Sequence, residues 1–206
     1  SGISYELLQR LHLLLEKDII PVVPSLGSVG ASGDLTPLSY VAAVIAGERE
    51  VYYQGEEKSA KEVFNKLNIK PYEFKPKEAL AIMNGTASMS AIAFVSIKKF
   101  EVLLASMESY VAGMYEVLLS DDTPLSQFVH DDSKPFLGQI QVAKNLREKI
   151  KGSRLTHGRD DRYDKFFNDN NLNIQDTYSI RCAPQVLGVV RENLEISKKW
   201  VEQEIN

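Results

Sequence analysis

The chain has 206 residues, of which 44% are hydrophobic, so it is long enough for one domain with a sizeable core. A formal net charge of −4 gives no electrostatic reason to expect nucleic acid or an anionic membrane as a partner. Cys182 is the only cysteine, which excludes an intramolecular disulfide and favours a reducing compartment, so we expect a cytoplasmic protein. No apolar run approaches the roughly 18 residues of a membrane span. The histidines stand singly without ligand-like spacing, so no metal site is expected.

The first third of the chain is predicted to contain short helices around a glycine-rich loop. Leucines at helical spacing indicate the first helix, and a run of β-formers before a Gln-Gly turn indicates a hairpin. The predicted elements are a helix over 5–17, an extended segment over 19–23, a helix over 35–46, a small surface β-hairpin at 50–55, and a short helix ending near Leu67.

The rest of the chain is predicted to be mainly helical. A proline-free segment over 86–119 carries apolar residues at periods of three and four, which predicts one long helix with a wide apolar face. Such a face must be covered by a helix bundle or by another subunit, and left uncovered it is expected to drive self-association. The other predicted elements are a polar loop over 120–134, a helix from Pro135 to about Ile150, a charged loop over 152–171 and a helix over 186–204.

The glycine-rich loop is the most informative stretch, and residues 27–34 read Gly-Ser-Val-Gly-Ala-Ser-Gly-Asp. Small residues flanked by glycine let the backbone turn tightly enough for one amide nitrogen to reach a neighbouring carbonyl carbon. Asp34 stands where the N-cap of the next helix is expected, and Pro37 fits its first turn. The plain alternative is an ordinary turn before a helix. The glycine spacing fits neither a dinucleotide fingerprint nor a P-loop, and a hydrolase nucleophile elbow needs glycine in place of Asp34.

Two further motifs lie downstream. Asn84-Gly85-Thr86 predicts at least a turn between two helices, with Thr86 capping the second. Residues 175–185 read Gln-Asp-Thr-Tyr-Ser-Ile-Arg-Cys-Ala-Pro-Gln. The planar guanidinium of Arg181 suits a carboxylate ligand that it can grip through both oxygens. The structural alternatives are a surface ion pair for Arg181 and a core position for Tyr178.

Taken together and in this order, the three motifs resemble those of the ammonia-lyases that act on histidine, phenylalanine and tyrosine. The resemblance implies a mainly α fold, the long-helix bundle core of an ammonia-lyase, with a small surface β-hairpin. It also implies a cofactor made from the chain itself, because in that family Ala-Ser-Gly cyclises autocatalytically to 4-methylidene-imidazol-5-one. Here Ala31 would supply the carbonyl carbon, Gly33 the attacking nitrogen, and Ser32 the exocyclic methylene after loss of its hydroxyl.

The resemblance assigns roles to other residues as well. Asn84 would face the electrophilic ring, and Tyr178 would lie against it and the reacting carbons. Arg181 would bind the α-carboxylate of the substrate, with Gln175 nearby, and Asp34 would support the loop. The implied reaction eliminates ammonia from histidine or an aromatic amino acid and releases a trans α,β-unsaturated acid. The branch that acts on phenylalanine and tyrosine is slightly favoured by residues 36–40 and 87–90.

Family subunits form homotetramers and are much longer than this sequence, which corresponds to their central part. We therefore expect a single core fragment of a larger lyase subunit, with the cofactor-loop region and a small β/α appendage over 1–75 and a helical-bundle part over 76–206. The family's tyrosine base and further pocket residues lie outside this part, so we expect little lyase activity from the chain alone. The alternatives are an aminomutase on the same scaffold, or a non-catalytic helical scaffold whose loop stays uncyclised.

Overall fold

The structure is a computed structural model in which residues 2–158 and 175–206 are described. It divides into two compact units, Ser1–Ile92 and Ala93–Asn206, with the boundary inside one long helix. Much of the charged loop expected over 152–171 therefore lies outside the described residues.

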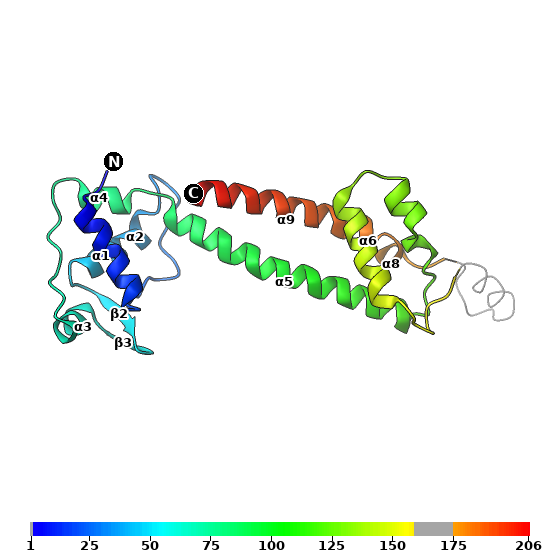
Figure 1. Ribbon diagram of the computed structural model, residues 1–206, viewed down its shortest axis with the longest axis horizontal. Helices are drawn as coiled ribbons and strands as arrows, with labels where there is room; N and C mark the ends of the chain where they lie inside the picture. Colours follow the sequence, from blue (N-terminus) through cyan, green and yellow to red (C-terminus); the bar gives the residue numbers. More distant parts are fainter. Residues whose placement is uncertain (1, 159–174) are drawn as a thin grey trace. The chain divides into compact units, whose positions relative to one another are not determined.

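The first unit contains short helices and a small sheet (Figure 1). Its elements are α1 (Tyr5–Glu16), β1 (Ile20–Pro21), α2 (Leu35–Ile45), β2 (Glu50–Tyr53), β3 (Glu56–Ser59), α3 (Ala60–Leu67), α4 (Glu78–Met83) and the first turns of α5 (Ala87–Val117). The predicted helices and the hairpin are confirmed, whereas α4 was not predicted. Helix α1 begins where expected, because the Ser4 hydroxyl accepts a hydrogen bond from the amide of Leu7 at 3.3 Å.

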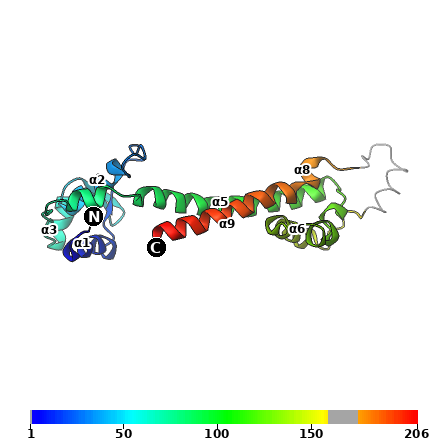
Figure 2. The same cartoon turned by 90° about the horizontal axis from the view of Figure 1, so that it is seen from above.

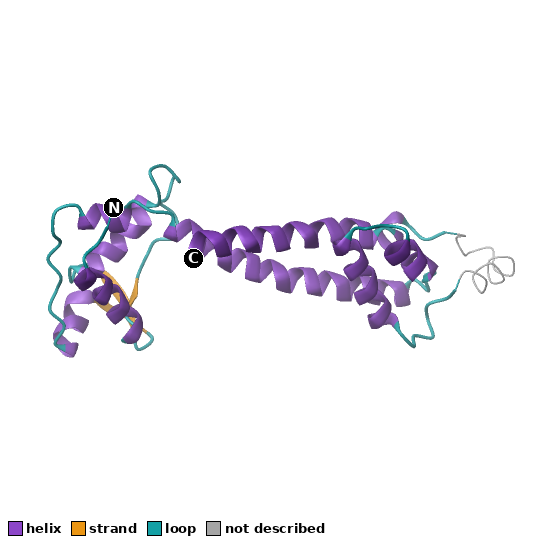
Figure 3. Cartoon of the chain, turned by 45° about the horizontal axis from the view of Figure 1, so that its top comes forward, coloured by secondary structure: helices purple, strands orange, loops and turns teal. Residues whose placement is uncertain are grey.

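The strands form one antiparallel sheet in the order β1-β2-β3, drawn in orange in Figure 3. The predicted turn at Gln54-Gly55 joins β2 to β3, and both residues have positive φ angles, 55° and 79°. The extended segment expected before the glycine loop contributes the third strand, since Ile20 pairs with Tyr52. Buried side chains of the sheet, the helices and the segments between them form the core of the unit. They are Leu7, Leu14, Ile19, Val44, Ile45, Val51, Tyr53, Ala60, Val63, Phe64 and Tyr72.

The second unit is helical, and Figure 2 shows α9 alongside α5, with α6 near one end of the pair. Its elements are the rest of α5, a 3₁₀ turn (Thr123–Leu125), a π-helical turn (Phe128–Asp132), α6 (Leu137–Ile150), α8 (Tyr178–Arg181) and α9 (Ala183–Ile205). Helix α6 begins two residues later than predicted and α9 three residues earlier.

The polar loop expected over 120–134 is wrong in part, because this segment contains the two short helical turns. The imidazole of His130 is fully buried and bonds the Pro124 carbonyl at 2.8 Å and the Gln139 amide at 2.9 Å. Leu125 is buried as well. The packing of these two side chains gives the segment an order that its polar composition did not suggest.

A buried carboxylate and a pair of glycines fix the helices of the second unit. Glu108 on α5 is 2% exposed and bonds Arg191 of α9 at 2.6 Å and Asn145 of α6 at 2.8 Å. Where α6 meets α9, a Cβ on Gly138 would lie 2.2 Å from the carbonyl oxygen of Gly188. The backbones of α6 and α9 are therefore in direct contact, as only glycine permits.

Helix α5 is confirmed as one long helix with a wide apolar surface, and the chain itself covers little of it. Large side chains such as Ile92, Val102 and Tyr110 are between 63% and 74% exposed. By length and composition the segment Glu78–Val117 could also span a membrane, which corrects the expectation that no apolar run is long enough. Lys98 and Glu101 lie near the middle of α5, where charges disfavour a membrane-spanning position.

Candidate active site

The glycine loop and the Asn84-Gly85 motif meet in the first unit. The Ser32 hydroxyl donates a hydrogen bond to the side-chain oxygen of Asn84 at 3.2 Å, although the two residues are 52 apart in sequence. The backbone amide of Asp34 donates to the carbonyl oxygen of Gly85 at 2.8 Å. Ala31, Ser32 and Asn84 are exposed, so the meeting point is open to a ligand.

Gly33 lies where no other residue fits. Its φ angle is +87°, and a Cβ at this position would lie 2.5 Å from the carbonyl oxygen and 2.8 Å from the nitrogen of Gly85. Ser32 beside it also has a positive φ angle, 61°, which is uncommon for a residue with a side chain. The loop is thus held in a strained conformation by contact with the next motif.

Asp34 does not act as the side-chain cap of α2, so that expectation is wrong. Its carboxylate accepts hydrogen bonds from the Ser28 hydroxyl and from the backbone amide of Met89, both at 2.7 Å. Met89 lies in the first turn of α5, where amide groups have no partner within the helix and favour a negative charge. Asp34 is fully buried and ties the loop to the start of α5, so its predicted supporting role rests on this different set of contacts.

Asn84 lies between two helices, as the turn interpretation predicts. It is the C-cap of α4, and its backbone amide donates to the carbonyl oxygen of Leu80 at 2.9 Å. Its side chain is thereby free of the helix and reaches Ser32. The turn and the contact with the loop are compatible.

The third motif forms a cluster in the second unit. When the Gln175 amide is oriented with its oxygen towards Arg181, that oxygen accepts hydrogen bonds from Nη1 and Nη2 of Arg181, the latter at 2.9 Å. The guanidinium carbon of Arg181 lies 5.4 Å from the centre of the Tyr178 ring. Tyr178 is 74% exposed, which is against the alternative of a core aromatic residue. The three residues thus present a guanidinium oriented on one side by an amide and on the other by an aromatic face.

Two hydrogen bonds, one of them buried, hold this cluster in place. The Tyr115 hydroxyl donates to the carbonyl oxygen of Ile180 at 3.2 Å, and burial raises the pKa of Tyr115, so the hydroxyl keeps its proton. The carboxylate of Asp176 accepts the backbone amide of Asp121 at 2.8 Å. Tyr115 was assigned no role from the sequence, and its hydroxyl carries no local signal because its partner is 65 residues away.

The fold and the two motif clusters define a class of protein: a mainly α core of ammonia-lyase type, built on long helices with a small sheet. Comparison with known proteins agrees. The sequence profile described as "Aromatic amino acid lyase" matches residues 1–206. The chain belongs to the aromatic amino acid lyase family.

Both ammonia-lyases and an aminomutase match the whole chain. It is 39% identical over 206 residues to a histidine ammonia-lyase from Shouchella clausii, covering 100% of this chain and 39% of that protein. It is 36% identical over 215 residues to a phenylalanine ammonia-lyase from Mycosarcoma maydis, covering 100% of this chain and 30% of that one. Among solved structures, a phenylalanine aminomutase from Pantoea agglomerans superposes with a TM-score of 0.90 at 30% identity, over 100% of this chain and 41% of that chain. The chain therefore spans about two fifths or less of the length of these relatives.

Proposed function

We propose that the protein eliminates ammonia from histidine or an aromatic amino acid and releases a trans α,β-unsaturated acid. The observation that carries this proposal is the meeting of Ser32 with Asn84, at 3.2 Å, beside a glycine that has no room for a Cβ. An ordinary glycine-serine turn has no need of such a contact with a second motif.

The loop residues fit the family's cofactor. Gly33 has a positive φ angle, which suits the tight turn needed for its nitrogen to attack the Ala31 carbonyl. Ser32 is exposed, so a methylene formed from it would be reachable by a substrate. The cofactor, 4-methylidene-imidazol-5-one, supplies an electrophilic carbon that makes the substrate's amino group a better leaving group.

In the proposed homotetramer, where residues of several subunits form one active site, the other residues of each cluster would bind and orient the substrate. Arg181 would hold the α-carboxylate through charge-assisted hydrogen bonds, and Gln175 fixes the plane of its guanidinium. The exposed ring of Tyr178 would border the same ligand. Asn84 would keep its amide directed at the residue 32 position. In the reaction the Cα–N bond and one Cβ–H bond break, the proton goes to a base, and ammonia leaves.

An aminomutase is the second candidate, because several of the similar solved structures carry that name. A tyrosine aminomutase from Streptomyces globisporus superposes with a TM-score of 0.87 at 31% identity, besides the Pantoea enzyme. An aminomutase returns ammonia to the β-carbon, so its product is a β-amino acid. We further propose a cytoplasmic homotetramer, supported by the lone Cys182 and by the exposed apolar face of α5.

The first test is the intact mass of the natural polypeptide. Cyclisation removes two water molecules, so we expect a mass lower than the encoded one by that amount. Ser32→Ala cannot form the methylene and should lack the absorbance of the ring, whereas Ser39→Ala should form it normally, because its hydroxyl bonds only the Thr36 carbonyl of its own helix.

The second test uses histidine, phenylalanine and tyrosine as substrates with product identification. An unsaturated acid supports the lyase and a β-amino acid the aminomutase. The full encoded mass together with no product from any of the three would refute both.

A further inference from the structure

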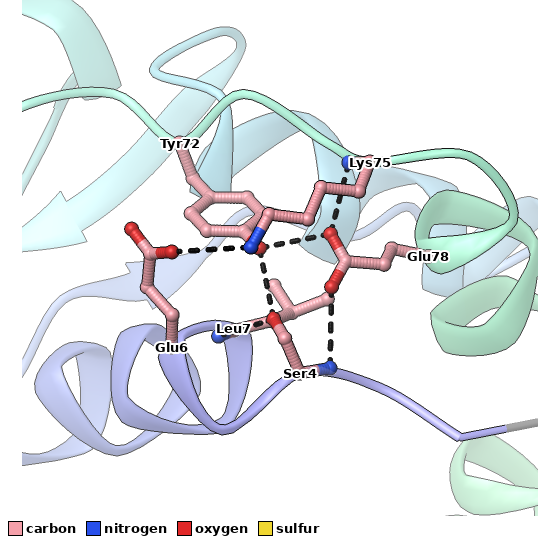
Figure 4. A network of polar contacts seen from close by, with 6 residues as sticks. All are labelled: Ser4, Glu6, Leu7, Tyr72, Lys75 and Glu78. Atoms are coloured by element: carbon pink, nitrogen blue, oxygen red, sulfur yellow. Dashed lines mark hydrogen bonds and ion pairs between the residues drawn. The ribbon is translucent and has the colours of Figure 1, made fainter.

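Glu78, the first residue of α4, carries a buried carboxylate with several hydrogen-bond donors around it (Figure 4). The residue is 6% exposed. One carboxylate oxygen accepts the backbone amide of Ser4 at 3.1 Å. The other accepts the Tyr72 hydroxyl at 2.8 Å and the backbone amide of Lys75 at 2.9 Å. A lone buried charge is costly, but one that receives three hydrogen bonds is stabilised and fixed in place.

These contacts join segments that are far apart in sequence. Ser4 caps α1, and its hydroxyl also bonds the Tyr72 hydroxyl at 3.0 Å. The backbone amide of Tyr72 donates to the carbonyl oxygen of Ile45, at the end of α2, at 3.0 Å. Glu78 thus connects the first turn of α4 to the start of α1 and, through Tyr72, to the end of α2.

The other end of α4 is fixed at the candidate active site. Asn84 caps α4 and bonds Ser32, and Gly85 accepts the amide of Asp34 at the start of α2. Helices α2 and α4 therefore run antiparallel and are joined near both ends. Since α4 is a short rigid helix, its displacement at Glu78 would be passed on to Asn84.

The charge of Glu78 is secured by its surroundings. The Ser4 hydroxyl, the Lys75 amide and the Tyr72 hydroxyl hold the pKa of Glu78 at about 2, although burial acts in the opposite direction. Lys77, directly before it, has a φ angle of 72°, a left-handed conformation that persists only where the surrounding structure imposes it. Both observations indicate that the start of α4 is held at one defined position.

We propose that Glu78 is a positioning residue for the active site: by anchoring α4 to Ser4 and Tyr72 it sets the place of Asn84 against Ser32. The proposal rests on the proposed function for its catalytic readout, but its structural readout does not depend on that function. None of the hydrogen-bond partners of Glu78 among the described residues belongs to the glycine loop. Its effect on Ser32 therefore passes along a helix, and an Asn84→Ala background separates the route along α4 from the one through Tyr72 and α2.

The test uses Glu78→Gln in the intact natural polypeptide. An amide keeps the shape of the side chain but presents an NH₂ group to at least one of the donors, so α4 loses its anchor. We expect kcat to fall about 10- to 100-fold, the range for small displacements of catalytic groups, with a smaller change in KM. Glu78→Asp should restore part of the lost kcat. In an Asn84→Ala background, Glu78→Gln should lower kcat no further, since the group that it positions is gone.

A matched control separates positioning from lost stability. Val63→Ala removes a buried methyl pair from the same core, away from α4, and lowers stability without moving Asn84. It should leave kcat at the wild-type value under conditions where the protein is folded. A loss of kcat in Val63→Ala equal to that in Glu78→Gln, or a full further loss in the double variant, would overturn the proposal.

Hydrogen exchange gives the readout that is independent of catalysis. The Asp34 amide, bonded to Gly85, should exchange faster in Glu78→Gln relative to amides of β2 and β3, whereas Val63→Ala should speed all of them alike. If the wild type forms no ring and no product, but this selective effect on Asp34 is present, the proposed function fails and the positioning role stands. Equal exchange of Asp34 in the two variants would contradict the positioning role itself.

Discussion

Replacing Gly33 with alanine tests the contact that shapes the candidate cofactor loop. The added Cβ would lie 2.5 Å from the Gly85 carbonyl oxygen, much closer than any real contact of this kind. The φ angle of +87° adds backbone strain. The strain costs about 1–2 kcal/mol and the overpacking about 1–3 kcal/mol. We therefore expect Gly33→Ala to lower the free energy of unfolding of the first unit by about 2–5 kcal/mol, a large part of the usual 5–15 kcal/mol.

Gly55→Ala is the matched control. Gly55 has a similar φ angle, +79°, in the β2–β3 turn, but a Cβ there meets nothing within 4 Å. It should cost only the backbone strain, about 1–2 kcal/mol. The difference between the two variants therefore isolates the contact with Gly85.

The assay is unfolding in urea, with hydrogen exchange of backbone amides as the probe of the first unit. Fluorescence of Trp200, the only tryptophan, reports the second unit and should be the same in both variants. Gly33→Ala should also fail to form the ring, because the added Cβ would push residue 33 away from Gly85. An equal loss of stability in the two variants would refute the reasoning, because it would mean that Gly85 moves aside without cost.

Two further predictions follow from charged groups. Because its folded-state pKa of about 2 lies below the ordinary value of 4.5, Glu78 stabilises the first unit at neutral pH, and this contribution should disappear as the pH falls from about 5 towards 2. Between pH 5 and pH 2 the free energy of unfolding should change less with pH in Glu78→Gln than in the wild type. An equal pH dependence in the two proteins would contradict the stabilising role of the Glu78 carboxylate. Arg181→Lys should raise KM about 10- to 100-fold with a smaller effect on kcat, because it removes the two-point contact proposed for the α-carboxylate. Arg191→Lys, which disturbs only the pair with Glu108, should change stability and leave KM alone.

The sequence was sufficient for elements whose signals are local. The leucine spacing of α1 and the long apolar period of α5 depend on neighbours within a few residues, and both elements are confirmed. Helix α4 was missed because it is only six residues long, although Pro76 before it and the acidic Glu78 in its first turn were available signals. The turn over 128–132 was missed for another reason: its order depends on the burial of His130, which its polar neighbours conceal.

In the candidate site too, local motifs were predictable from the sequence and long-range contacts were not. The resemblance of the motifs gave Ser32, Asn84 and Arg181, but not the contacts that hold them. Asp34 was expected to cap the helix that follows it, and instead its carboxylate reaches Met89, 55 residues away. A partner at such a distance along the chain leaves no periodicity or spacing to detect. Long-range hydrogen bonds of this kind become visible only in three dimensions.

The glycine contact between α6 and α9 also determines where the third motif lies. Helix α9 begins directly after Arg181 and Cys182, so the place where it crosses α6 also fixes the third motif. At that crossing the backbones meet at Gly138 and Gly188, and the Glu192 carboxylate accepts the amide of Gly138 at 2.8 Å. A Cβ at either glycine would push α9 away from α6, and the third motif would move with it.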